Sequence, residues 1–193
     1  MKLQTLSVIA AVAAMGIPPA QAATTIIGDS VTVACARAAM ASPQSAPAQR
    51  EALQDCDAAL AGKLTAQDRT ATLVNRGIVQ AAAGRTDAAI GDFADALARD
   101  PHLASAYVSR GAALMQLGRY AEARADFDRA LSLNAARPEL AYFNRGMANE
   151  KLGDLTAAYR DYRQAAMLAP GFAPANVELA RFQVVPRRVA QNR

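Results

Sequence analysis

Cys35 and Cys56 carry the only thiols in this chain of 193 residues. Their spacing is far from the Cys-x-x-Cys arrangement of redox-active pairs, which disfavours a dithiol catalyst. In an oxidising compartment a disulfide between them is the leading interpretation, and it would close a loop of about 20 residues and contribute roughly 3 kcal/mol to stability. Two buried free thiols are the alternative.

No other residues have the spacing of a catalytic or metal site. The single histidine, His102, follows Pro101 in an expected turn, and no serine or cysteine is placed as its nucleophilic partner. No histidine and cysteine cluster has the ligand spacing of a zinc site, and no glycine-rich phosphate loop occurs. We therefore expect a protein that is not an enzyme and needs no cofactor or metal.

Arginine and aspartate recur in step along the chain. The recurring residues are Arg76, Arg110 and Arg145 with Asp92, Asp126 and Asp161, and Asp55 occupies the matching place further upstream. Each arginine could reach the aspartate of its own unit or of the preceding unit, and the sequence does not choose between them. A bidentate, partly buried pair would fix the register of two helices. The alternative is a row of arginines for an anionic ligand, which the matched acids would neutralise.

These residues belong to a repeat of about 34 residues. Shifting the sequence by that period superposes two glycines, an alanine and an aromatic residue of each unit: Gly77, Gly111 and Gly146; Gly84, Gly118 and Gly153; Ala89, Ala123 and Ala158; Phe93, Phe127 and Tyr162. We expect the first glycine to face the alanine where two helices cross. The second glycine should end a helix in the left-handed conformation, and the ring should fill the seam between units.

The composition suits closely packed helices. Hydrophobic residues make up 52% of the chain and aromatic residues only 5%, which disfavours an all-β fold. Charged residues make up 20%, with 21 Lys and Arg against 17 Asp and Glu. This mild excess, without a continuous basic face or an aromatic platform, makes nucleic acid a poor candidate partner.

The repeat resembles the tetratricopeptide repeat, whose spacing of small, glycine, aromatic and proline positions it follows. The resemblance implies an all-α, right-handed α-solenoid of helix-turn-helix units. We place the units at residues 70–103, 104–138 and 139–172. We expect a degenerate half-repeat within an N-terminal segment, 23–69, with helices at Thr32–Met40 and 50–61. A capping helix at 173–183 and a disordered basic tail at 184–193 complete the organisation.

The resemblance also implies a peptide groove on the concave face of the first helices. Its lining would be Val74, Asn75, Ile78, Val108, Ser109, Ala112, Met115, Phe143, Asn144, Met147 and Lys151. In similar repeats an asparagine binds the backbone of an extended peptide, because an amide both donates and accepts. The alternative is that the asparagines cap local backbone groups and the apolar residues fill gaps. Only Lys151 is placed for a carboxylate clamp, which argues against capture of a C-terminal carboxylate.

The first 22 residues have the pattern of a secretory signal peptide, with Lys2, an apolar run and the ending Ala20-Gln21-Ala22. We expect cleavage after Ala22 and a periplasmic or secreted product without an integral membrane span, an uncleaved anchor being the alternative. The predicted function is a periplasmic adaptor or assembly factor that binds a protein or an extended peptide segment on its concave face. The alternative is a structural subunit of an oligomer or permanent envelope complex, without a free groove.

Overall fold

The computed structural model describes residues 30–41 and 45–182, and every regular element in these ranges is an α-helix. The predicted signal peptide and the basic tail lie outside the described residues. The helices are α2 (Ser30–Ala41), α3 (Ala46–Ala61), α4 (Ala66–Ala82), α5 (Thr86–Arg99), α6 (Ala104–Gln116), α7 (Tyr120–Ser132), α8 (Pro138–Lys151), α9 (Leu155–Leu168) and α10 (Ala173–Arg181).

Local residues decide where these helices begin and end. Thr65 caps α4, because its hydroxyl oxygen accepts a hydrogen bond from the backbone N–H of Asp68. The turns from α4 to α5, α6 to α7 and α8 to α9 each contain a glycine with positive φ: 74° at Gly84, 73° at Gly118 and 86° at Gly153. Only glycine adopts this conformation cheaply, so the predicted role of the second glycine is confirmed.

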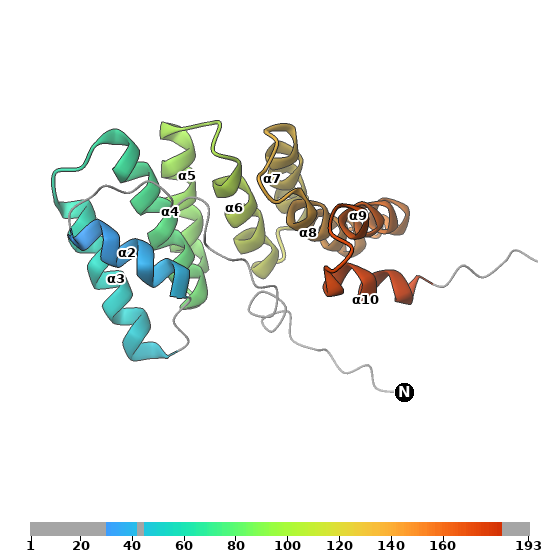
Figure 1. Ribbon diagram of the computed structural model, residues 1–193, viewed down its shortest axis with the longest axis horizontal. Coiled ribbons are helices and arrows are strands. Elements are labelled where there is room, and N and C mark those ends of the chain that lie inside the picture. The colour runs from blue at the N-terminus through green and yellow to red at the C-terminus, as the bar shows by residue number, and fades with distance from the viewer. Residues whose placement is uncertain (1–29, 42–44, 183–193) are drawn as a thin grey trace, which may run out of the picture.

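The helices form antiparallel pairs that stack side by side along the long axis of the molecule, with α2 and α3 at one end and α10 at the other (Figure 1). The first helices α4, α6 and α8 contact one another in succession, whereas the second helices α5, α7 and α9 make no comparable contacts. The array therefore curves with the first helices on its inner side. This is a helical solenoid.

In each of the three repeat units an aromatic ring packs between the two helices, against the first glycine of the unit. A Cβ atom built on Gly111 would lie 2.7 Å from Cε1 of Phe127, and one on Gly77 would lie 2.6 Å from the same atom of Phe93. The nearest neighbours of these glycines are thus the rings. Phe127 also belongs to a core cluster with Ala141 and Ala148 of the next unit, so the ring does pack at the seam.

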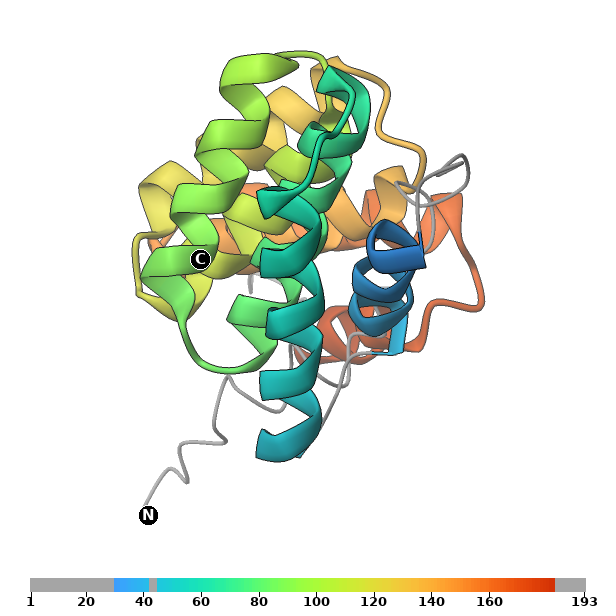
Figure 2. The ribbon, with the colours of Figure 1, turned by 90° about the vertical axis from the view of Figure 1, so that its left-hand side faces the viewer.

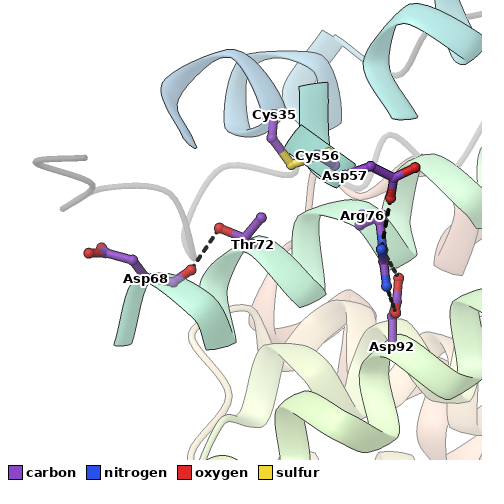
Figure 3. Close-up of a disulfide and its surroundings, with 7 residues drawn as sticks. All are labelled: Cys35, Cys56, Asp57, Asp68, Thr72, Arg76 and Asp92. Atoms are coloured by element: carbon purple, nitrogen blue, oxygen red, sulfur yellow. Dashed lines mark hydrogen bonds and ion pairs between the residues drawn. A yellow bond between two sulfur atoms is a disulfide. The ribbon is translucent and has the colours of Figure 1, made fainter. Parts of the chain in front are cut away.

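The N-terminal end is closed by α2. Figure 2 looks along the array from this end, where α2 lies beside α3 and α4. A disulfide joins Cys35 of α2 to Cys56 of α3 (Figure 3), as the leading interpretation of the two cysteines expected. Both cysteines are fully buried. Among the side chains of α2 from Thr32 onward, the other buried ones are small, namely Thr32, Ala36 and Ala39, so the disulfide adds an attachment that large apolar side chains supply elsewhere.

Candidate functional site

The structure buries more of the predicted groove than the sequence suggested. Six of its residues are less than one-tenth exposed: Val74, Asn75, Val108, Met115, Phe143 and Asn144. Ile78, Ser109, Ala112 and Met147 are half-buried, and Lys151 is exposed. Val74, Val108 and Phe143 occupy the same position of the repeat, and their burial has a common cause, because each belongs to a core cluster that includes the following unit or α10. Phe143, for example, stacks edge-on against Phe172 with ring centroids 5.3 Å apart.

Asn75 is 1% exposed and belongs to α4, the helix that α2 contacts. Thr72 lies beside the disulfide (Figure 3), and Val79 packs against Ala39 of α2. Asn75 follows Thr72 by three residues and precedes Val79 by four, so it lies on the same face of α4. Its Nδ2 atom is buried and has no hydrogen-bond partner among the described residues. The N-terminal part of the predicted groove is therefore closed.

The accessible part of the concave side lies on α6 and α8. Ser109 and Ala112 of α6 and Met147 of α8 present small or flexible side chains, and Lys151 ends the row. Among the predicted lining residues Lys151 is the only cation. This surface can offer hydroxyl hydrogen bonds and adaptable apolar contact, but little attraction for an acidic ligand.

A polar cluster fastens α10 at the C-terminal end of this surface. Arg181 of α10 forms ion pairs with Glu150 of α8, at 3.0 Å, and with Glu178. The hydroxyl of Tyr162 donates a 2.8 Å hydrogen bond to the same Glu150. Burial of the phenol, and then this hydrogen bond, raise the pKa of Tyr162 well above its usual value. The cluster orients α10 as the start of a further, incomplete pair.

The recurring arginines pair with the aspartates of their own units, which settles the choice that the sequence left open. Arg110 donates from Nε and Nη2 to the two carboxylate oxygens of Asp126, at 2.8 Å and 2.7 Å. Arg76 makes the same bidentate contact with Asp92, and Arg145 makes it with Asp161. Each pair joins the two helices of one unit.

Two of these arginines also reach across a seam to a second carboxylate. Nη1 of Arg76 donates to Asp57 of α3 at 2.8 Å, and Nη1 of Arg145 donates to Asp128 of α7 at 2.7 Å. Figure 3 shows the guanidinium of Arg76 between Asp57 and Asp92. This second row was not predicted from the sequence. The signal was present, since both aspartates directly follow the aromatic position of their unit.

The ion pairs have direct electrostatic consequences. The hydrogen bonds with Asp92 and Asp161 raise the pKa values of Arg76 and Arg145, and the hydrogen bond with Asp126 raises that of Arg110; burial opposes each shift. The guanidinium carbons of Arg110 and Arg145 also lie over the rings of Tyr107 and Tyr142, 5.5 Å and 5.2 Å from the ring centroids. These arginines are engaged within the fold and do not line the concave side.

The described residues contain no candidate metal site, and the single histidine stands at the surface. His102 is exposed, and its backbone N–H donates to Asp100. Residues 30–41 and 45–182 contain no group of three histidine, cysteine, aspartate or glutamate side chains able to hold a metal ion. None of the described helices is long and apolar enough to cross a membrane.

Comparisons with known proteins agree with this geometry. Two tetratricopeptide repeat (TPR) family models match residues 74–140 and 139–172. The Hsp70-Hsp90 organizing protein of Triticum aestivum is 37% identical over 90 residues, which are 46% of this chain and only 15% of that protein.

Solved structures share the fold. The second TPR domain of human RPAP3, determined with the HSP70 peptide SGPTIEEVD, is 26% identical with a TM-score of 0.57; the match covers 61% of this chain and 97% of that one. A MamA double mutant (RS-1) is 19% identical with a TM-score of 0.65, covering 80% and 83%. With the stacked helical pairs and their glycine–ring contacts, these matches confirm the predicted all-α, right-handed solenoid. The chain belongs to the tetratricopeptide repeat family.

Proposed function

We propose that this protein is an interaction module that binds a protein or an extended peptide segment on the concave side of α6 and α8. The observation that carries the proposal is the row of accessible residues Ser109, Ala112, Met147 and Lys151 on the inner side of a curved array. The likeness to a human RPAP3 domain solved with a bound peptide supports it. Catalysis has no place in the proposal.

The chemistry of the row indicates the kind of segment that would bind. The RPAP3 peptide ends in the acidic sequence EEVD. Here the accessible row offers Lys151 as its one cation, while Ala112 and Met147 favour uncharged, apolar side chains. A partner segment rich in small and apolar residues therefore fits this surface better than an acidic C-terminus does.

Site-specific photocrosslinking tests the proposal before the partner has been identified. A benzoylphenylalanine at Ala112 should crosslink one defined partner protein in the producing cells, whereas the same residue at Ala88, exposed on α5, should not. Ala112→Arg should then abolish binding of that partner, and Ala88→Arg should leave it unchanged. Crosslinks that form equally from Ala88, or a partner that still binds Ala112→Arg, would reject the concave surface.

The alternative function is that of a structural subunit whose concave side is covered in a permanent assembly. Light scattering of the purified protein separates the two. A monomer with an accessible Ala112 supports the interaction module. A stable oligomer in which the crosslinker at Ala112 joins copies of this chain supports the structural subunit.

We further propose that the protein is exported to the periplasm after cleavage behind Ala22. Support comes from the signal-like N-terminal sequence and from the disulfide between Cys35 and Cys56, which is typical of oxidising compartments. N-terminal sequencing of the protein from its native cells should begin at Ala23. A sequence that begins at Met1 would rule out cleavage.

A further inference from the structure

The second carboxylate on the recurring arginines is present at two seams and missing at the third. Asp57 occupies Nη1 of Arg76 at the seam between α3 and α4, and Asp128 occupies Nη1 of Arg145 at the seam between α7 and α8. At the seam between α5 and α6, the position equivalent to these aspartates is Ala94. Among the described residues no carboxylate contacts Nη1 of Arg110.

Arg110 nevertheless keeps the orientation of the other two arginines. Its Nε and Nη2 atoms are held by Asp126, and its side chain is 25% exposed, against 24% for Arg76 and for Arg145. The bidentate contact fixes the plane of the guanidinium, so Nη1 points toward α5, as the same atom of Arg145 points toward α7. The Nη1 donor of Arg110 is thus held in position but has no acceptor among the described residues.

There is room for an acceptor to approach. Ala94 is half-buried, Ala98 is exposed, and a Cβ built on Gly91 would meet no atom within 4 Å. The face of α5 beside Arg110 is therefore lined by small residues. Asp95, the residue after Ala94, is exposed and forms no ion pair with Arg110 in the described part of the chain.

We propose that Arg110 binds an aspartate or glutamate side chain of a protein partner at the seam between α5 and α6. The partner's carboxylate takes the place that Asp57 and Asp128 take at the other seams. It accepts from Nη1 of Arg110 while Asp126 holds the remainder of the guanidinium. The site lies toward the second helices, so it is separate from the concave surface of α6 and α8 and does not depend on its function.

Nuclear magnetic resonance of the arginine Nε–Hε groups tests the site with defined probes. The probes are acetate and the capped peptide acetyl-Ala-Ala-Glu-Ala-Ala-amide, titrated at neutral pH and constant ionic strength, with the glutamine peptide as the uncharged control. We expect saturable shifts at Arg110 from acetate and from the glutamate peptide. Arg76 and Arg145 should respond much less, because their Nη1 positions are occupied.

Ala94→Asp supplies the missing carboxylate from within the chain. This variant should weaken the apparent affinity of the Arg110 site for acetate and for the glutamate peptide at least about fivefold, which corresponds to the free energy of one intramolecular hydrogen-bonded pair. It should not lower the melting temperature. Ala88→Asp places the same charge on a different, exposed face of α5 and should leave the response unchanged.

Each alternative outcome overturns the proposal. Equal shifts at all three arginines would show nonspecific anion binding, and an unchanged response in Ala94→Asp would place the carboxylate elsewhere. A response to acetate without one to the glutamate peptide would mean that the seam admits small carboxylates but no side chain of a partner protein.

Discussion

Substitution of Gly111 by alanine tests how the units are packed. The added Cβ would lie 2.7 Å from Cε1 and 2.9 Å from Cζ of Phe127, closer than carbon atoms approach without displacement. The ring is fully buried in a cluster with Ala130 and Ala141, so it has nowhere to move. Overpacking of this kind costs about 1–3 kcal/mol.

The helix itself would gain from the substitution, because alanine is favoured over glycine in a helix interior by about 0.5–1 kcal/mol. The net expectation for Gly111→Ala is a loss of about 1–2 kcal/mol, which lowers the melting temperature by about 2–8 °C. Circular dichroism at 222 nm during thermal and urea unfolding measures it.

Gly91→Ala is the matched control. Gly91 lies in α5, where an added Cβ meets no atom within 4 Å, so this variant should gain about 0.5–1 kcal/mol. In a double-mutant cycle, Phe127→Leu should cost less in the Gly111→Ala background by about 1 kcal/mol, since the smaller side chain relieves the overlap. If Gly111→Ala is as stable as the unmodified protein while Gly91→Ala is stabilised, the close packing of glycine and ring is refuted.

Three further predictions concern the ion pairs, the disulfide and pH. Arg110→Ala leaves the buried Asp126 carboxylate unpaired and should cost about 1–3 kcal/mol in urea unfolding, with Arg110→Asp combined with Asp126→Arg recovering part of the loss. Replacing Cys35 and Cys56 by serine should cost about 3 kcal/mol on the chain-entropy argument and increase hydrogen exchange in α2; two alkylatable thiols in the unreduced native protein would contradict the bond. The pKa of Tyr162 is raised in the fold above its ordinary value of 10.0, so its contribution to the free energy of unfolding is complete below pH 10 and is lost as pH rises further and the tyrosine of the unfolded chain ionises. The stability of Tyr162→Phe should therefore fall less steeply with pH above pH 10 than that of the unmodified protein, and identical alkaline profiles would refute this.

The repeat could be recognised without a structure because its determinants are local. Gly84, Gly118 and Gly153 end helices in a conformation that only glycine adopts cheaply, and the spacing of apolar residues defines helices on either side. Short helical pairs cannot bury their apolar faces alone, so a repeated pair predicts a stack.

Other features depended on distances between helices that lie far apart in the sequence. The repeat period allowed Arg110 to pair with Asp92 or with Asp126. Only the packing of α6 against α7 brings a carboxylate oxygen of Asp126 to 2.8 Å from Nε of Arg110. In the same way, the position of Asn75 on a first helix predicted a place in the groove, but α2 covers that face of α4.

The sequence by itself determined the helical pairs, their turns and the order in which they stack, because these follow from residue spacing within one unit. The tertiary structure decided which carboxylate each arginine binds, which groove residues remain accessible and which seam lacks its carboxylate. Those properties depend on contacts between units, where a side chain's neighbours are set by the packing of whole helices and not by the period of the chain.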